Sequence, residues 1–137
     1  GGNSDVIQYV TIDTTGNSTD FGNLTQAKKE GGGVSSGTRA AFAGDDVSQA
    51  NVIDYITIAS TGNASDFGDL TAGRSGVGAV SSKTRGVWGG GTISGTGAVN
   101  TMDYVTIAST GNATDFGDRT LSVSQLTGLS NGHGGLQ

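Results

Sequence analysis

The chain has 137 residues, of which 33% are hydrophobic, enough for the core of one domain. Its formal net charge is −5 and its seven Lys and Arg residues are scattered, which argues against a nucleic-acid partner because phosphate binding needs a cationic face. No apolar run is long enough to insert into a membrane, and no cysteine is present to form disulfides or thiolate metal sites.

Glycine is abundant and proline is missing. With 26 glycines and no prolines, the turns must be made by Gly, Asn and Asp. No stretch repeats apolar residues at helical spacing over three turns. We therefore predict an all-β chain of many short strands.

One segment occurs three times along the chain. The copies are TIDTTGNSTDFGN from Thr11, TIASTGNASDFGD from Thr57 and TIASTGNATDFGD from Thr106, and their tyrosines, Tyr9, Tyr55 and Tyr104, are 46 and 49 residues apart. One active site needs one set of groups, so a motif repeated three times indicates architecture. We predict a single repeat domain over residues 1–137, with repeats at about 1–43, 44–90 and 91–137.

The middle copy shows the expected strand order. Asn51 to Ser60 alternates two mostly apolar faces, which is typical of a strand covered on both sides. STGN follows, where we expect Gly62 and Asn63 at positive φ in a tight turn. Ala64 to Thr71 (ASDFGDLT) then returns as the outer strand.

The DFGD motif in this outer strand predicts one buried aromatic residue per repeat. Phe67 is expected between layers, as are its counterparts Phe21 and Phe116. Asp66 and Asp69 invite a calcium interpretation, but no D-x-[DN]-x-[DN]-G run is present. We favour carboxylates that cap turn amides, and we predict no metal site and no cofactor.

Two further strands complete the middle repeat. Gly76 to Ser82 (GVGAVSS) is small and apolar, as expected next to a central channel, and Thr84 to Gly91 (TRGVWGGG) runs into a glycine cluster. Four strands in a period of 40 to 50 residues suggest a propeller blade.

Four Asn-X-Ser/Thr triplets are candidate glycosylation sites. They begin at Asn17, Asn23, Asn63 and Asn112. Three of them lie in the recurring turn, where we favour a backbone role for Asn.

Catalysis is not expected. His133 is the only histidine and has no Ser or Cys elbow or second ligand beside it, so we predict that it ends the last repeat and that the protein is not an enzyme.

These features together resemble the kelch-type β-propeller repeat. The resemblance lies in a second strand that ends at Gly89–Gly91, with a weaker counterpart in residues 41–44, and in a fourth strand with an aromatic residue. The family commonly has Trp in that strand, whereas this chain has Phe. The DYVTIASTGNATDFGD pattern and the SNGHGG ending are similar to kelch-like repeats in virion structural proteins of tailed bacteriophages.

The resemblance implies an all-β, kelch-like propeller with four antiparallel strands per blade. The chain starts after a second strand and ends within one, where Gln137 aligns with Trp88 and Phe42. The repeats are thus circularly permuted, and the two ends could complete one blade. Three blades are too few for a ring, so we expect either oligomerisation with copies of the chain or further repeats missing here.

The segments that differ between copies are the candidate binding sites. Residues 44–51 and 91–101 join the second and third strands, and repeats vary where loops are free or engaged in recognition. The candidate binding residues are Asp45, Asp46, Trp88, Thr92 and Ser94.

Two functions are compatible with the sequence. The first is a structural or attachment module of a phage virion, extracellular, which contacts itself or other virion proteins and binds host-surface glycans. The alternative is a purely architectural repeat that assembles with itself and binds no ligand.

Overall fold

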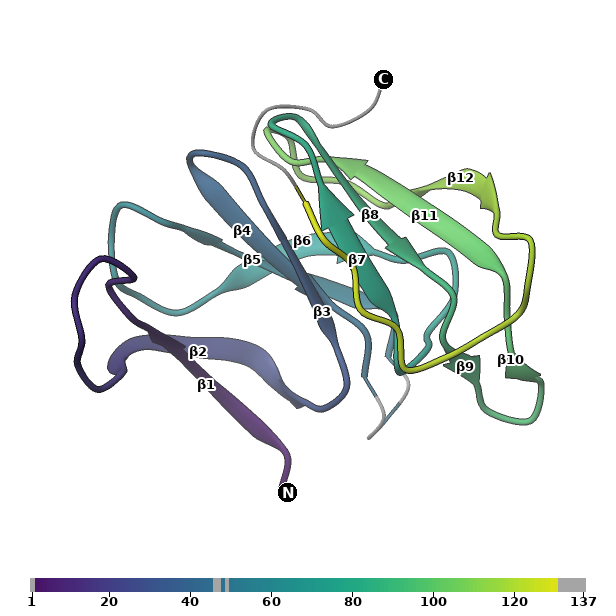
Figure 1. Ribbon diagram of the computed structural model, residues 1–137, viewed down its shortest axis with the longest axis horizontal. Helices are drawn as coiled ribbons and strands as arrows, with labels where there is room; N and C mark the ends of the chain where they lie inside the picture. Colours follow the sequence, from purple (N-terminus) through teal and green to yellow (C-terminus); the bar gives the residue numbers. More distant parts are fainter. Residues whose placement is uncertain (1, 46–47, 49, 131–137) are drawn as a thin grey trace.

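The computed structural model describes residues 2–45, 48 and 50–130 (Figure 1). These residues form twelve strands, all in antiparallel pairings, and no helix. The all-β prediction is confirmed. In this described part of the chain, no helix is long and apolar enough to cross a membrane.

Two four-stranded antiparallel sheets dominate the described structure. The middle sheet contains β3 (Gly32–Ser35), β4 (Arg39–Ala43), β5 (Val52–Thr57) and β6 (Ser65–Asp69), in this spatial order. The last sheet contains β7 (Gly78–Ser81), β8 (Arg85–Gly89), β11 (Thr101–Thr106) and β12 (Thr114–Asp118), again in chain order. Each sheet joins the last two strands of one predicted repeat to strands of the next, so the structural units are shifted from the divisions at 43/44 and 90/91. From here on, a repeat means one such structural unit, and residues 2–28 belong to the first.

The first repeat contributes a two-stranded hairpin. β1 (Ser4–Tyr9) pairs with β2 (Thr19–Lys28), and these strands correspond to β5 and β6 of the middle sheet. Among the described residues, no strand pairs with the other edge of β1. A second small hairpin, β9 (Thr92–Ile93) with β10 (Gly97–Ala98), lies in the loop between β8 and β11.

The first strands of successive repeats lie side by side. β3 is next to β7, and the segment 124–130, yellow in Figure 1, runs along the other side of β7. The Ser35 amide donates to Ser81 Oγ (3.3 Å), and the Ser81 amide donates to Ser130 Oγ (2.6 Å). Segment 124–130 therefore occupies the place of a further first strand.

The same backbone conformation recurs ahead of each of these strands. Glu30, Gly76 and Gln125 have φ values of 61°, 63° and 57°, which are uncommon for Glu and Gln. The Gly76 amide donates to the Glu30 carbonyl (3.0 Å), and the Gln125 amide donates to the Gly76 carbonyl (2.8 Å). The three copies are thus equivalent in structure as well as in sequence.

The core lies between the middle and last sheets. Its members include Ile53 and Phe67 from the middle sheet and Trp88 and Val105 from the last sheet. The prediction of an aromatic residue buried between layers is confirmed for Phe67 and Phe21, but it is wrong for Phe116, which is 48% exposed because no further described repeat packs against it. Each repeat supports this aromatic with a tyrosine in an edge-to-face contact: Tyr9 with Phe21, Tyr55 with Phe67, and Tyr104 with Phe116.

The turn after β5 differs from the prediction. It lies at residues 58–60, where the Ser60 amide donates to the Thr57 carbonyl (3.4 Å). Gly62 and Asn63 follow this turn, and Asn63 does not have positive φ, so the predicted hairpin turn at these two residues is wrong. The reason is that this segment is committed to a contact with the preceding repeat.

Candidate functional site

The TGN segment of the middle repeat docks on the outer strand of the first repeat. The Gly62 amide donates to the Phe21 carbonyl (2.7 Å), and the Ala64 amide donates to the Asn23 carbonyl (2.8 Å). The side chain of Asn63 completes the contact, because its Oδ1 accepts from the Asn23 amide (3.1 Å). Asn63 thus contributes to the contact between repeats through its side chain, and not through the positive φ that the sequence suggested.

The same contact joins the middle and last repeats. The Gly111 amide donates to the Phe67 carbonyl (2.7 Å), and the Ala113 amide donates to the Asp69 carbonyl (2.7 Å). Asn112 Oδ1 accepts from the Asp69 amide (3.1 Å). Two of the three repeated TGN segments therefore act as identical connectors between repeats.

The glycine of the DFG segment makes this close approach possible. A Cβ at Gly22 would overlap the carbonyl oxygen of Gly62, and a Cβ at Gly68 would overlap that of Gly111. Both glycines also have φ in the range that favours glycine, at 148° and 142°. The three-residue segment DFG is thus the receiving half of the contact, and TGN is the inserted half.

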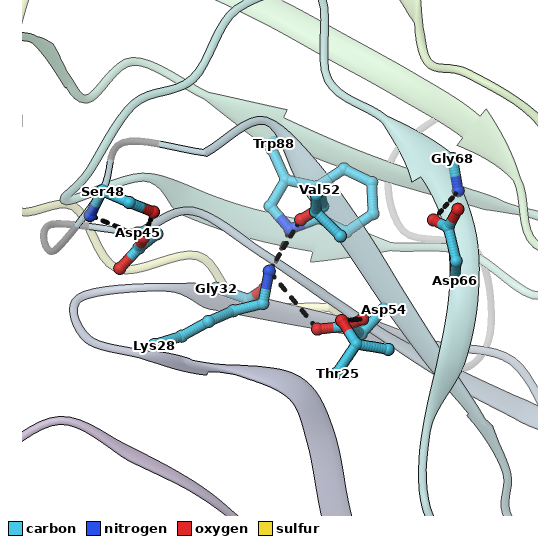
Figure 2. A network of polar contacts seen from close by, with 10 residues as sticks. All are labelled: Thr25, Lys28, Gly32, Asp45, Ser48, Val52, Asp54, Asp66, Gly68 and Trp88. Atoms are coloured by element: carbon cyan, nitrogen blue, oxygen red, sulfur yellow. Dashed lines mark hydrogen bonds and ion pairs between the residues drawn. The ribbon is translucent and has the colours of Figure 1, made fainter.

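A second polar contact joins the same repeats deeper inside. Asp54 on β5 is fully buried and accepts a hydrogen bond from Thr25 Oγ1. Lys28 Nζ lies 3.4 Å from the Asp54 carboxylate and donates to the Val52 carbonyl (2.8 Å), as Figure 2 shows. A threonine and a cation of one repeat thus bind the aspartate of the next.

The equivalent contact between the middle and last repeats is more buried. Asp103 on β11 accepts from Thr71 Oγ1 (2.7 Å) and from the Thr71 amide (3.2 Å). Arg74 Nη2 lies 2.9 Å from Asp103 Oδ2 and donates to the Trp88 carbonyl (3.3 Å). Neither charged side chain has exposed surface, so the cost of burying each charge is offset by the opposite charge of the other.

Sequence reasoning missed this threonine, cation and aspartate set. The partners are far apart in the chain, because the residue numbers of Thr25 and Asp54 differ by 29 and those of Thr71 and Asp103 by 32. A signal was nevertheless present, since LT followed by a cation and the Asp-Tyr pair recur at the same repeat positions.

A hollow lined by hydroxyl groups lies where the turns of the two sheets meet segment 124–130. Its volume is about 490 Å³, and its lining residues are Ser35, Ser36, Gly37, Ser81, Ser82, Lys83 and Ser130. Serine hydroxyls both donate and accept hydrogen bonds, and one lysine supplies a cation. These groups suit hydrogen bonds to a hydroxyl-rich ligand, and no carboxylate or imidazole is among the described lining residues.

Two of the predicted binding residues are buried. Trp88 has no exposed surface and its Nε1 donates to the Gly32 carbonyl (2.9 Å), so the expected aromatic contact with a ligand is corrected to a core role. Asp45 is also fully buried, and its carboxylate accepts from the Ser48 amide (2.9 Å) and hydroxyl (2.6 Å), visible in Figure 2. Packing between sheets and satisfaction of loop amides account for these two residues.

Thr92 and Ser94, the remaining predicted residues that the structure describes, lie in or beside the β9–β10 hairpin. Thr92 exchanges backbone hydrogen bonds with Ser75 (2.8 and 3.1 Å), and Ser94 is exposed in the β9–β10 hairpin. Asp46 and His133 lie outside the described residues. Neither Thr92 nor Ser94 lines the hydroxyl-lined hollow.

The carboxylates of the DFGD segments cap amides as expected. Asp66 Oδ1 accepts from the Gly68 amide (3.0 Å), and Asp115 Oδ1 accepts from the Gly117 amide (2.9 Å). Over residues 2–45, 48 and 50–130, no group of three or more His, Asp or Glu side chains is placed to hold a metal ion.

Comparison with known proteins adds no family assignment. No family model matches the chain, and no curated protein matches it.

Proposed function

We propose that the chain is a non-enzymatic structural module with kelch-like propeller architecture, in which each repeat supplies a blade of four antiparallel strands. The observation that carries this proposal is the repetition of one interface. TGN docks on DFG, and an aspartate binds a threonine and a cation, at both junctions between repeats. The side-by-side order of β3, β7 and segment 124–130 is the order that inner strands of adjacent blades have around a central axis.

A virion setting is the biological part of the proposal. The repeats resemble those of tailed-phage virion proteins, and a composition rich in Gly, Ser, Thr and Asn suits a soluble extracellular surface. Its partners would be further copies of the chain or other virion proteins.

A crystal structure of the 137-residue protein tests the architecture. We expect the inner strands of all repeats to lie around one axis, whereas repeats stacked along a straight line would contradict the propeller. A screen against glycosides and esters tests the absence of enzyme activity. Turnover that is lost on Asp66→Asn or Asp115→Asn would overturn the non-enzymatic proposal, since the amide removes the charge at either carboxylate.

Glycan binding is a second candidate function, favoured by the hydroxyl-lined hollow. Short polar side chains around a hollow of about 490 Å³ can exchange hydrogen bonds with sugar hydroxyls. This hollow replaces the loop residues as the candidate ligand site, because Trp88 and Asp45 are buried.

A glycan array with two matched variants tests this second function. Gly37→Leu projects a side chain from a lining position where nothing lies within 4 Å, so it should abolish binding by filling the hollow while leaving the fold intact. Thr96→Leu adds the same side chain at the exposed tip of the β9–β10 hairpin and should bind as the unmodified protein does. Equal binding by both variants would exclude the hollow as the site.

A further inference from the structure

The outer strand of the last repeat carries an interface that none of the residues 2–45, 48 and 50–130 covers. Phe116 is 48% exposed, whereas its equivalents Phe21 and Phe67 are 9% and 2% exposed beneath the following repeat. Gly117 has no described atom within 4 Å of a Cβ position, although the glycines before it in the series each face a carbonyl oxygen. We call Tyr104, Phe116, Gly117, Asp118 and Thr120 the trailing face.

The first repeat has the complementary half of the same interface exposed. Ile12 is 93% exposed, whereas its equivalents Ile58 and Ile107 are 44% and 0% exposed. Val10 is 56% exposed and its equivalent Val105 only 3%. We call Gln8, Val10, Ile12, Gly16 and Asn17 the leading face.

The TGN segment of the first repeat docks on no DFG segment among the described residues. Gly16 and Asn17 are exposed, and no described residue lies within 4 Å of a Cβ placed on Gly16. Asn63 and Asn112, the equivalents of Asn17, each accept an amide hydrogen bond from the preceding repeat. Asn17 is placed to accept the same bond from an Asp118 amide.

The buried charges show which face this leading face fits. Asp54 and Asp103 each bind a cation of the preceding repeat, but the first repeat has Gln8 at that position. The cation position of the last repeat is likewise neutral, because Val123 stands there. If the two faces met, Gln8 would lie against Val123, so this pair of positions would bury neither a carboxylate nor a cation. Because Gln8 and Val123 are both neutral, the leading face of the first repeat matches the trailing face of the last in charge at this position.

We propose that copies of this chain associate head to tail, with the leading face of one copy on the trailing face of the next. This inference rests on the proposed structural function and names its partner. The contact is heterologous, so it closes a ring when the rotation per copy allows and otherwise extends a filament. In Figure 1 the β1–β2 hairpin and β12 lie at opposite sides of the molecule, so the two faces of one copy do not meet each other.

Sedimentation velocity of the full 137-residue chain over a concentration series tests the association. We expect a ring of defined mass or an open series of oligomers. Ile12→Lys should weaken association by about 100-fold or more, because it places a charge where the equivalent Ile107 has no exposed surface. Thr96→Lys, which adds the same charge on the exposed β9–β10 hairpin, should associate as the unmodified chain does.

A double-mutant cycle tests the proposed pairing of Gln8 with Val123. Gln8→Asp alone should weaken association by about 100-fold, since it buries a carboxylate without a cation. Adding Val123→Arg recreates the pair seen between Asp103 and Arg74, and it should recover at least about tenfold of that loss. Independent effects of the two changes would overturn the pairing.

The result also separates this inference from the proposed function. A chain that stays monomeric up to about 1 mM, with a cooperative unfolding transition, would overturn self-association while leaving the stacked repeats intact. An isologous dimer unaffected by Ile12→Lys would overturn it as well. Repeats arranged along a straight line in the crystal would overturn the propeller whatever the mass in solution.

Discussion

Replacing Asp103 with alanine is expected to lower the free energy of unfolding by about 3–5 kcal/mol, because it leaves a buried guanidinium without its counter-ion. Arg74 and Asp103 have no exposed side-chain surface, and their charged atoms are 2.9 Å apart. The hydroxyl and amide of Thr71 also lose their acceptor. Urea unfolding followed by far-UV circular dichroism measures the change.

Two further variants separate charge burial from loss of a carboxylate. Asp115→Ala removes an exposed aspartate that accepts one amide hydrogen bond, and it should change the unfolding midpoint little. The double variant Arg74→Met with Asp103→Leu replaces both charges with apolar groups, and it should recover most of the stability that Asp103→Ala loses. If Asp103→Ala is no less stable than Asp115→Ala, the buried pair does not hold the two repeats together.

The strands could be predicted because their signals are local. The segment 51–60 contains β5 (Val52–Thr57), and 84–91 contains β8 (Arg85–Gly89), since alternating and β-branched residues favour strands wherever the chain places them. The turn after β5 could not be placed correctly, because the docking of Asn63 on the neighbouring repeat overrides local turn preferences.

The candidate site depended on tertiary contacts and was largely missed. Trp88 was expected to be available to a ligand, yet it packs against the adjacent middle sheet and has no exposed surface. Asp45 was expected to be available to a ligand from its loop, yet it is buried. The repeated TGN and DFG segments were attributed to turn chemistry within one repeat, whereas their shared cause is the contact between two repeats. One copy of a motif does not reveal its partner, but positions that differ between copies suggest one, as the proposed pairing of Gln8 with Val123 illustrates.

Alanine at Gly68 is expected to destabilise the protein by about 3–5 kcal/mol, from backbone strain together with a clash across the interface. Gly68 has φ of 142°, and a Cβ there would overlap the carbonyl oxygen of Gly111. The last repeat would have to move away, which breaks the 2.7 Å hydrogen bond from the Gly111 amide to the Phe67 carbonyl. Urea unfolding measures the loss.

Gly117→Ala is the matched control, because it has the strain without the clash. Gly117 has φ of 121° but no described atom within 4 Å of a Cβ position, so alanine should cost only about 1–3 kcal/mol there. Both variants must be compared at concentrations too low for association, since docking of a second copy would add a clash at Gly117 as well. Equal destabilisation under these conditions would mean that the close approach of TGN to DFG contributes nothing to stability. At low concentration, Gly68→Ala should lower the free energy of unfolding more than Gly117→Ala does. If the two losses become equal as concentration rises, the same contact forms between repeats of one chain and between copies of the chain.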